Sequence, residues 1–269
     1  MPTISGRWTN SCGFTETDDL ALSAVSTGDN GGVGAQPRLY IFPHAGGSAD
    51  FYVPFARAFT RGVKCVAVQY PGKRAGRDLS QYVAIEELAD RLLTLLKPEE
   101  TPGSQIAFFG HSMGSLLAFE LALRFEQLGN PIAALFVSAS PAPGLLRRVA
   151  DVQGSDHQLL AWVSQVTGVN PEFLSDEQFA ATILPTLRAL KALVEYSSPP
   201  EARVSCPIHA LMADNDELAT HELVAPWGQR TTSAFDLTVF SGGHFYLNDH
   251  LPQLAQWVEE RVLAHCAGS

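Results

Sequence analysis

Positive charge is scarce in this sequence. The 269 residues include 18 Lys and Arg against 28 Asp and Glu, which gives a formal net charge of −10 at pH 7. Proteins that bind nucleic acids or anionic membranes rely on clustered basic residues, and the sequence has no run of them. The composition therefore argues against nucleic acid and against a membrane surface as partners.

Cysteines and long apolar runs are scarce as well. Cys12, Cys65, Cys206 and Cys266 are scattered, with no C-x-x-C pair and no nearby histidine cluster, so they predict neither a metal site nor a disulfide framework. No segment approaches the roughly 18 continuous apolar residues of a membrane span, and the first residues lack the pattern of a secretory signal. We expect a cytoplasmic protein.

The first 36 residues differ in amino-acid composition from the rest. They are rich in Gly, Ser, Thr, Asn and Asp, as in "STGDNGGVGAQP", a composition that buries too little apolar surface to offset the cost of ordering the backbone. We expect residues 1–36 to form a flexible leader. The remaining residues, 37–269, are long enough for one domain with a sizeable core.

After residue 37, short apolar and β-branched runs alternate with helical patterns. This alternation is typical of βαβ units around a mostly parallel sheet, so the predicted fold class is α/β. Strands are predicted at 39–42, 65–69, 106–109, 134–139, 208–213 and 237–240, and helices at 85–96, 115–128 and 251–264. Gly129 fits the position after the end of the second helix.

One interval is too long for a single crossover helix. About sixty residues, 140–203, separate two predicted strands and contain amphipathic helical patterns. Helices inserted there would lie over the carboxyl edge of the sheet and form a lid. A peripheral structural insertion is the alternative.

The stretch "FFGHSMGSLL" carries a Gly-x-Ser-x-Gly pattern centred on Ser112. The pattern alone has little weight, since about one random chain in ten of this composition would contain it. Here it follows an apolar strand and precedes an apolar helix, which is the context of a nucleophile elbow. Gly110 and Gly114 would leave room where strand and helix nearly touch, and the turn would expose the Ser112 hydroxyl.

A serine nucleophile needs a base and an acid that orients the base. In this architecture they follow the serine in the order acid, then histidine. His244 lies in "SGGHFYL", just past the last predicted strand, and is the candidate base. "LMADNDELAT" supplies Asp214, Asp216 and Glu217 after the preceding strand, and the residues alone do not choose among them.

Catalysis by such a serine also needs donors for the developing oxyanion. The N–H of Met113, the residue after the serine, lies at the start of a helix whose dipole favours negative charge. The second donor is expected from the glycine-rich loop "FPHAGGSADFY" after the first strand. The alternative is that the glycines of this loop serve only to form a tight turn before a helix.

The sequence resembles the type II thioesterases that accompany polyketide synthases and non-ribosomal peptide synthetases. The resemblance spans about residues 38–262 and is carried by "FPHAGGSA", "VQYPGKRAGR", "FFGHSMGSLLAFELALR" and "GGHFYLND". It implies an α/β-hydrolase fold and hydrolysis of acyl thioesters from the phosphopantetheine arm of acyl- or peptidyl-carrier proteins, removing stalled or aberrant groups. It also implies a lid within the long interval.

By position, the resemblance assigns the nucleophile to Ser112, the base to His244, the acid to Asp216, and the oxyanion donors to the backbone N–H groups of Ala45 and Met113. The family usually has Gly-x-x-Asp at the acid, whereas this chain has Ala213-Asp214-Asn215-Asp216. A serine mechanism requires neither a metal nor a bound cofactor. A general carboxylesterase or lipase, and a non-catalytic acyl-binding scaffold, are the alternatives.

Overall fold

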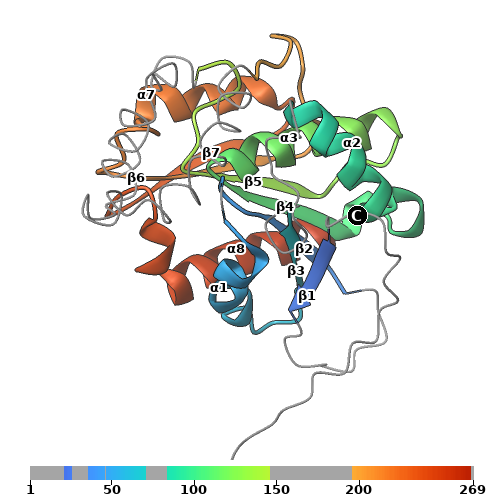
Figure 1. The fold of residues 1–269 in the computed structure, drawn as a ribbon, viewed down its shortest axis with the longest axis horizontal. Helices are drawn as coiled ribbons and strands as arrows, with labels where there is room; N and C mark the ends of the chain where they lie inside the picture. The colour runs from blue at the N-terminus through green and yellow to red at the C-terminus, as the bar shows by residue number, and fades with distance from the viewer. Residues whose placement is uncertain (1–20, 26–35, 46, 71–83, 146–195, 268–269) are drawn as a thin grey trace, which may run out of the picture.

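The computed structural model describes residues 21–25, 36–45, 47–70, 84–145 and 196–267. In these residues, seven strands form one sheet in the order β1-β3-β2-β4-β5-β6-β7 (Figure 1). β1 is antiparallel to β3, and every other neighbouring pair is parallel. The strands are β1 (Ala21–Val25), β2 (Arg38–Phe42), β3 (Lys64–Gln69), β4 (Ile106–His111), β5 (Ala134–Ser138), β6 (Ile208–Ala213) and β7 (Phe235–Phe240). The predicted α/β fold with a mostly parallel sheet is confirmed.

The predicted helices are present too, with small shifts at their ends. The α-helices are α1 (Val53–Arg57), α2 (Ile85–Leu96), α3 (Met113–Gln127), α7 (His221–Val224) and α8 (Leu251–Ala267). Short 3-10 turns are η1 (Ala49–Tyr52), η4 (Pro98–Glu100), η5 (Gly103–Gln105), η7 (Ala225–Arg230) and η8 (Tyr246–Asn248). As predicted, Gly129 follows α3 with a positive φ of 69°. None of the described helices is both long and apolar enough to cross a membrane.

Helices cover both faces of the sheet (Figure 1). Successive side chains of a strand point to opposite faces, so each buried strand feeds two cores. In β4, Phe108 packs in the core beneath α2 and α3, whereas Phe109 packs in the core shared with α1 and α8. All six residues of β4 are buried, which explains the unbroken apolar run of its first four residues, 106–109.

The prediction of a flexible leader over residues 1–36 is wrong at Ala21–Val25, which form β1. This strand pairs along the whole of its length with β3, from Ala21 opposite Gln69 to Val25 opposite Cys65. Each residue of this short strand gains a partner that lies at least 40 residues away in the sequence, from Val25 with Cys65 to Ala21 with Gln69, and local composition does not reveal such a partner. The other residues of the predicted leader up to 35 lie outside the described part of the chain.

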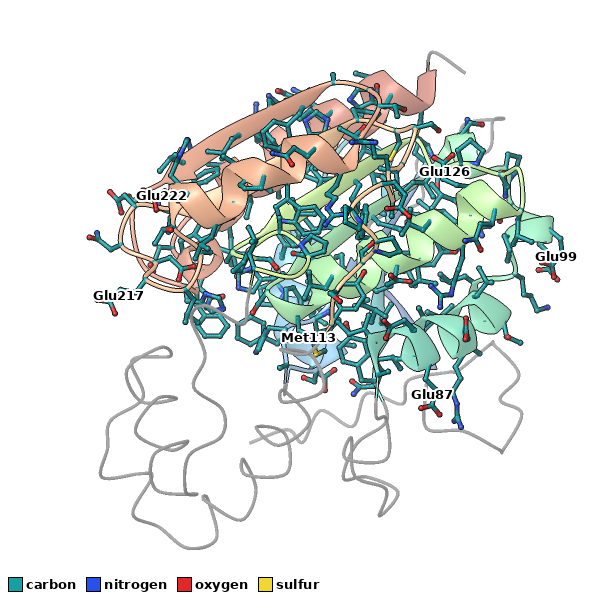
Figure 2. All side chains as sticks on the ribbon, turned by 90° about the horizontal axis from the view of Figure 1, so that it is seen from above. Glu87, Glu99, Met113, Glu126, Glu217 and Glu222 are labelled. Carbon is teal, nitrogen blue, oxygen red and sulfur yellow. The ribbon has the colours of Figure 1, made fainter. Side chains whose placement is uncertain are left out.

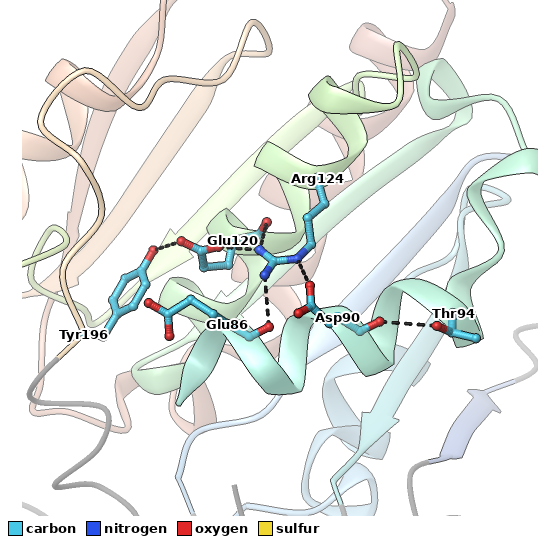
Figure 3. Close-up of polar contacts among 6 residues, drawn as sticks. All are labelled: Glu86, Asp90, Thr94, Glu120, Arg124 and Tyr196. Carbon is cyan, nitrogen blue, oxygen red and sulfur yellow. Dashed lines mark hydrogen bonds and ion pairs between the residues drawn. The ribbon is translucent and has the colours of Figure 1, made fainter. Parts of the chain in front are cut away.

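A cluster of polar side chains fastens α2 and the chain after residue 195 to α3 (Figure 3). The Tyr196 hydroxyl donates to Glu120 Oε1 at 2.6 Å, and Arg124 contacts the other oxygen of this buried carboxylate. Arg124 also donates from Nε to Asp90 Oδ1 at 2.7 Å and from Nη2 to the Glu86 carbonyl at 3.0 Å. The cluster thus anchors one end of the long interval on α3, the helix that follows the candidate nucleophile.

Candidate active site

Ser112 lies at a sharp turn between β4 and α3. Its φ of 55° and ψ of −121° are unusual for a residue with a side chain. A Cβ on Gly110 would overlap the backbone of Gly114, and a Cβ on Gly114 would overlap the Phe42 carbonyl. Both glycines are therefore required by close backbone approach, as the elbow interpretation predicts. The Ser112 side chain does not cap α3, so its hydroxyl is not engaged by the helix that it precedes.

His244 and Asp216 meet at the carboxyl edge of the sheet. Asp216 Oδ2 lies 2.8 Å from His244 Nδ1, and both side chains are buried. The other Asp216 oxygen accepts the Leu218 N–H at 3.0 Å, which fixes the carboxylate in place. With Nδ1 turned to the carboxylate, the imidazole offers Nε2 as its second site for a proton.

Asp214 has a different set of contacts. Its exposed carboxylate accepts the Gly242 N–H at 2.9 Å and the Asn215 side-chain amide at 3.0 Å. The Asn215 N–H donates to the Gly242 carbonyl at 3.0 Å. Asp214 therefore holds the loop that carries His244, whereas Asp216 contacts the histidine ring.

The elbow and the histidine loop are packed together through ring contacts. His111, next to Ser112, is fully buried, and its ring centroid lies 5.4 Å from that of His244. Phe245 contacts both rings, at 5.6 Å from His111 and 5.2 Å from His244. The structure thus brings the loop of the candidate base against the residue that precedes the candidate nucleophile.

The candidate oxyanion donors come from two neighbouring elements. Met113 is the first residue of α3, so its N–H has no acceptor within the helix. Figure 2 shows Met113 at this end of the helix and Glu126 at the other. Ala45 follows β2 and packs against the same core cluster that includes Met113. The close approach of the Phe42 carbonyl to Gly114 brings the end of β2 against the start of α3.

His44 is a feature of the site that the sequence argument missed, because only histidines after Ser112 were considered as partners of the serine. Its Nδ1 lies 2.9 Å from the Tyr52 hydroxyl, which also accepts the His44 backbone N–H at 3.3 Å. The two contacts with Tyr52 fix the orientation of the His44 imidazole at the end of β2. Burial, with a smaller contribution from His244, lowers the pKa of His44 to about 4.

His111 is held neutral in the same way. Burial, together with the nearby rings of His244 and His44, lowers the pKa of His111 well below its ordinary value of 6.5. Two neutral imidazoles therefore flank the histidine loop. The sequence signal was present at both positions, since His44 follows the first strand of the domain and His111 lies inside the elbow motif.

These two depressed pKa values predict a fall in stability in mild acid. Between pH 6.5 and about 4 the unfolded chain binds protons at His44 that the folded protein does not, so the free energy of unfolding falls as the pH falls. We expect a lower urea midpoint at pH 5 than at pH 7 by circular dichroism. In His44→Gln the difference should shrink, and an unchanged difference would contradict this origin.

His209, inside β6 as predicted, belongs to a separate cluster. Its Nδ1 lies 2.7 Å from Asp236 Oδ2 and its Nε2 lies 3.0 Å from Nε2 of His265. His209 is the second residue of β6, at the amino edge of the sheet, whereas Asp216 follows the carboxyl end of the same strand. This histidine pair therefore takes no part in the candidate site.

Comparison with known proteins agrees with this geometry. The sequence model of the family described as "Thioesterase domain" matches residues 37–262. The chain belongs to the thioesterase family. It is 47% identical to Thioesterase TesA of Mycobacterium leprae (strain TN) over 241 residues, which are 90% of this chain and 92% of that protein. It is 36% identical to Thioesterase PikA5 of Streptomyces venezuelae over 228 residues, covering 84% and 81% of the two chains.

Among solved structures, the type II thioesterase BorB from the borrelidin biosynthetic cluster superposes on this thioesterase with a TM-score of 0.74. The two are 36% identical, and the match covers 93% of this chain and all of BorB. The predicted resemblance to type II thioesterases and the predicted thioester hydrolase activity are thereby confirmed. Most of the interval assigned to a lid, residues 146–195, lies outside the described residues.

Proposed function

We propose that this thioesterase hydrolyses acyl thioesters carried on the phosphopantetheine arm of acyl- or peptidyl-carrier proteins. Its task would be to remove stalled or aberrant acyl groups from a polyketide or non-ribosomal peptide synthase. The observation that carries the chemistry is the buried pair of Asp216 and His244, 2.8 Å apart, beside the elbow that holds Ser112. The biosynthetic setting is supported by the relation to BorB, a type II thioesterase from the borrelidin biosynthetic cluster.

In the proposed mechanism, Ser112 is the nucleophile, His244 the general base and Asp216 the acid that orients it. His244 Nε2 accepts the serine proton as Oγ attacks the thioester carbonyl, and the carbonyl π electrons move to oxygen. Asp216 accepts a hydrogen bond from Nδ1–H and stabilises the imidazolium. The N–H groups of Ala45 and Met113 donate to the oxyanion.

Collapse of the tetrahedral intermediate breaks the carbon–sulfur bond, and the thiolate leaves with the proton held by His244. A water molecule then gives a proton to the same nitrogen and attacks the acyl-serine ester. The second intermediate releases the carboxylic acid, and Ser112 regains its proton.

Two features of the chain complete the proposal. Residues 37–269 form one catalytic domain, with the interval 140–203 as a lid over the site, because that interval is far longer than a crossover needs. The described ends of this interval are tied to the body of the domain, because Trp227 donates to the Ser140 carbonyl at 2.9 Å and Arg230 donates to the Pro199 carbonyl at 2.6 Å. We also propose that the enzyme is cytoplasmic. The three cysteines within the described residues are free thiols, as is usual in a reducing compartment.

Paired substrates of equal chain length test the thioesterase proposal against the carboxylesterase alternative. Acyl-pantetheine thioesters should be cleaved with a kcat/KM at least about 10-fold above that of the matching oxygen esters, and acyl groups loaded on a carrier protein should be released with loss of mass. Preference for oxygen esters would favour a general esterase or lipase. Binding of the acyl thioester without turnover would favour the non-catalytic scaffold.

A further inference from the structure

Ser138 is a buried serine to which the proposed mechanism gives no role. It is the last residue of β5 and lies opposite His111, the last residue of β4, in the parallel sheet. Its exposed fraction is 0%. Buried hydroxyl groups require hydrogen-bond partners, so the partners of Ser138 indicate what it holds together.

The backbone of Ser138 supports the nucleophile elbow. Its carbonyl accepts the Ser112 N–H at 2.7 Å, and its N–H donates to Ser115 Oγ at 3.1 Å. Ser115 Oγ in turn donates to the Gly110 carbonyl at 2.9 Å. A residue in a strained conformation persists only where its surroundings determine it, and these bonds hold Ser112 at its positive φ. Since they involve the Ser138 main chain, they survive replacement of its side chain.

The side chain of Ser138 reaches the other half of the site. Its Oγ lies 2.9 Å from His111 Nδ1 and 2.8 Å from the Tyr246 hydroxyl, and all three groups are buried. Tyr246 follows His244 by two residues, and its N–H donates to the Gly243 carbonyl at 3.0 Å. A chain of hydrogen bonds therefore runs from the Ser112 peptide through Ser138 to the loop of the candidate base.

Among the described residues, one arrangement of the protons in these hydrogen bonds gives each hydroxyl an acceptor. Tyr246 O–H donates to Ser138 Oγ, and the Ser138 hydroxyl donates to His111 Nδ1. This arrangement requires a neutral His111 ring, which agrees with the lowered pKa of this fully buried histidine. Removing the Ser138 hydroxyl would leave two buried polar groups, at His111 and Tyr246, without their partner.

We propose that Ser138 is a positioning residue, whose hydroxyl fixes the loop of His244 against the elbow of Ser112 through Tyr246 and His111. The inference rests on the proposed serine mechanism, because it concerns the alignment of the same two residues. A reacting pair held by packing alone would tolerate the loss of this hydroxyl. A misplacement of about 1 Å, in contrast, costs on the order of 10²-fold in rate.

The test measures alignment directly by the rate at which a fluorophosphonate labels Ser112, alongside kcat and KM for an acyl-pantetheine thioester. Ser138→Ala and Tyr246→Phe should each lower the labelling rate and kcat by about 10- to 100-fold, with KM within about twofold. The labelling rate of the double variant should lie within about threefold of that of the slower single variant, because both substitutions break the same chain of hydrogen bonds. Ser140→Ala is the matched control, because within the described part of the chain the hydroxyl of this buried serine bonds to the neighbouring Pro141 carbonyl and to nothing in the chain of hydrogen bonds at Ser138, and it should keep the wild-type rates.

The outcomes separate the two proposals. Failure of the fluorophosphonate to label wild-type Ser112 would overturn the proposed serine mechanism itself. Normal labelling of the wild type together with wild-type rates in Ser138→Ala would overturn only the positioning role, even if the variant melts at a lower temperature. If Ser138→Ala fails to fold, Tyr246→Phe decides alone: it keeps the ring stacked on Phe240, and a wild-type labelling rate in it would refute the inference.

Discussion

Replacing Ser112 by alanine should remove nearly all thioester hydrolysis. The variant keeps the oxyanion donors and the binding surface but has no nucleophile, so the residual rate should be roughly 10³ to 10⁴ over the reaction in water. We expect no burst of released thiol in stopped-flow assays with an acyl-pantetheine thioester, because no acyl-enzyme forms.

Ser241→Ala provides a control in the same neighbourhood. Ser241 lies in the loop that leads to His244, but its hydroxyl is near His250 Nε2, at 3.3 Å, on the exposed side. This variant should keep hydrolysis within about twofold of the wild type. Near-normal activity in Ser112→Ala would mean that another residue attacks the thioester.

The second large effect is expected from Asp216→Asn. Asparagine offers a donor as well as an acceptor at this position, so it can stabilise the tautomer that has its proton on Nε2, which is unable to accept the serine proton. Loss of the correct tautomer and of the charge should lower kcat on the order of 10⁴-fold. Steady-state assays across a range of pH would measure it.

Asp214→Asn is the matched variant, since the two carboxylates lie two residues apart in one turn. The Asn oxygen can still accept the Gly242 N–H that Asp214 Oδ1 accepts now. We expect a loss of no more than about tenfold, from a less firmly held histidine loop. A loss of this order, about 10⁴-fold, in Asp214→Asn alone would show that Asp214, and not Asp216, orients the histidine.

The strands and the elbow were predictable because their signals are local. The run ending at Phe109 and the spacing of Gly110, Ser112 and Gly114 encode a strand, a turn and a helix without reference to the rest of the chain. His244 was also accessible from the sequence, since it follows the last strand of a parallel sheet, whose carboxyl ends meet at one edge.

The contacts of the acid were not predictable from the residues alone. Asp214 and Asp216 have the same chemistry and follow the same strand, so their different contacts depend on how the turn at Asn215 pairs with Gly242. The contributions of His44 and His111 were hidden for a similar reason. Their partners, Tyr52 and Ser138, are 8 and 27 residues away in the sequence, and only the folded chain brings each pair together.

The strand β1 has a practical consequence for where this domain begins. Without β1, β3 would be the edge strand of the sheet. The unpaired backbone N–H and C=O groups of β3, whose residues are mostly apolar, would then be available to a strand of a second molecule. Both the composition of the sequence and the family match place the start of the domain at residue 37. A chain trimmed at that residue loses the strand that shields this edge and becomes prone to self-association. A protein prepared for crystallisation or assay should therefore begin before Ala21.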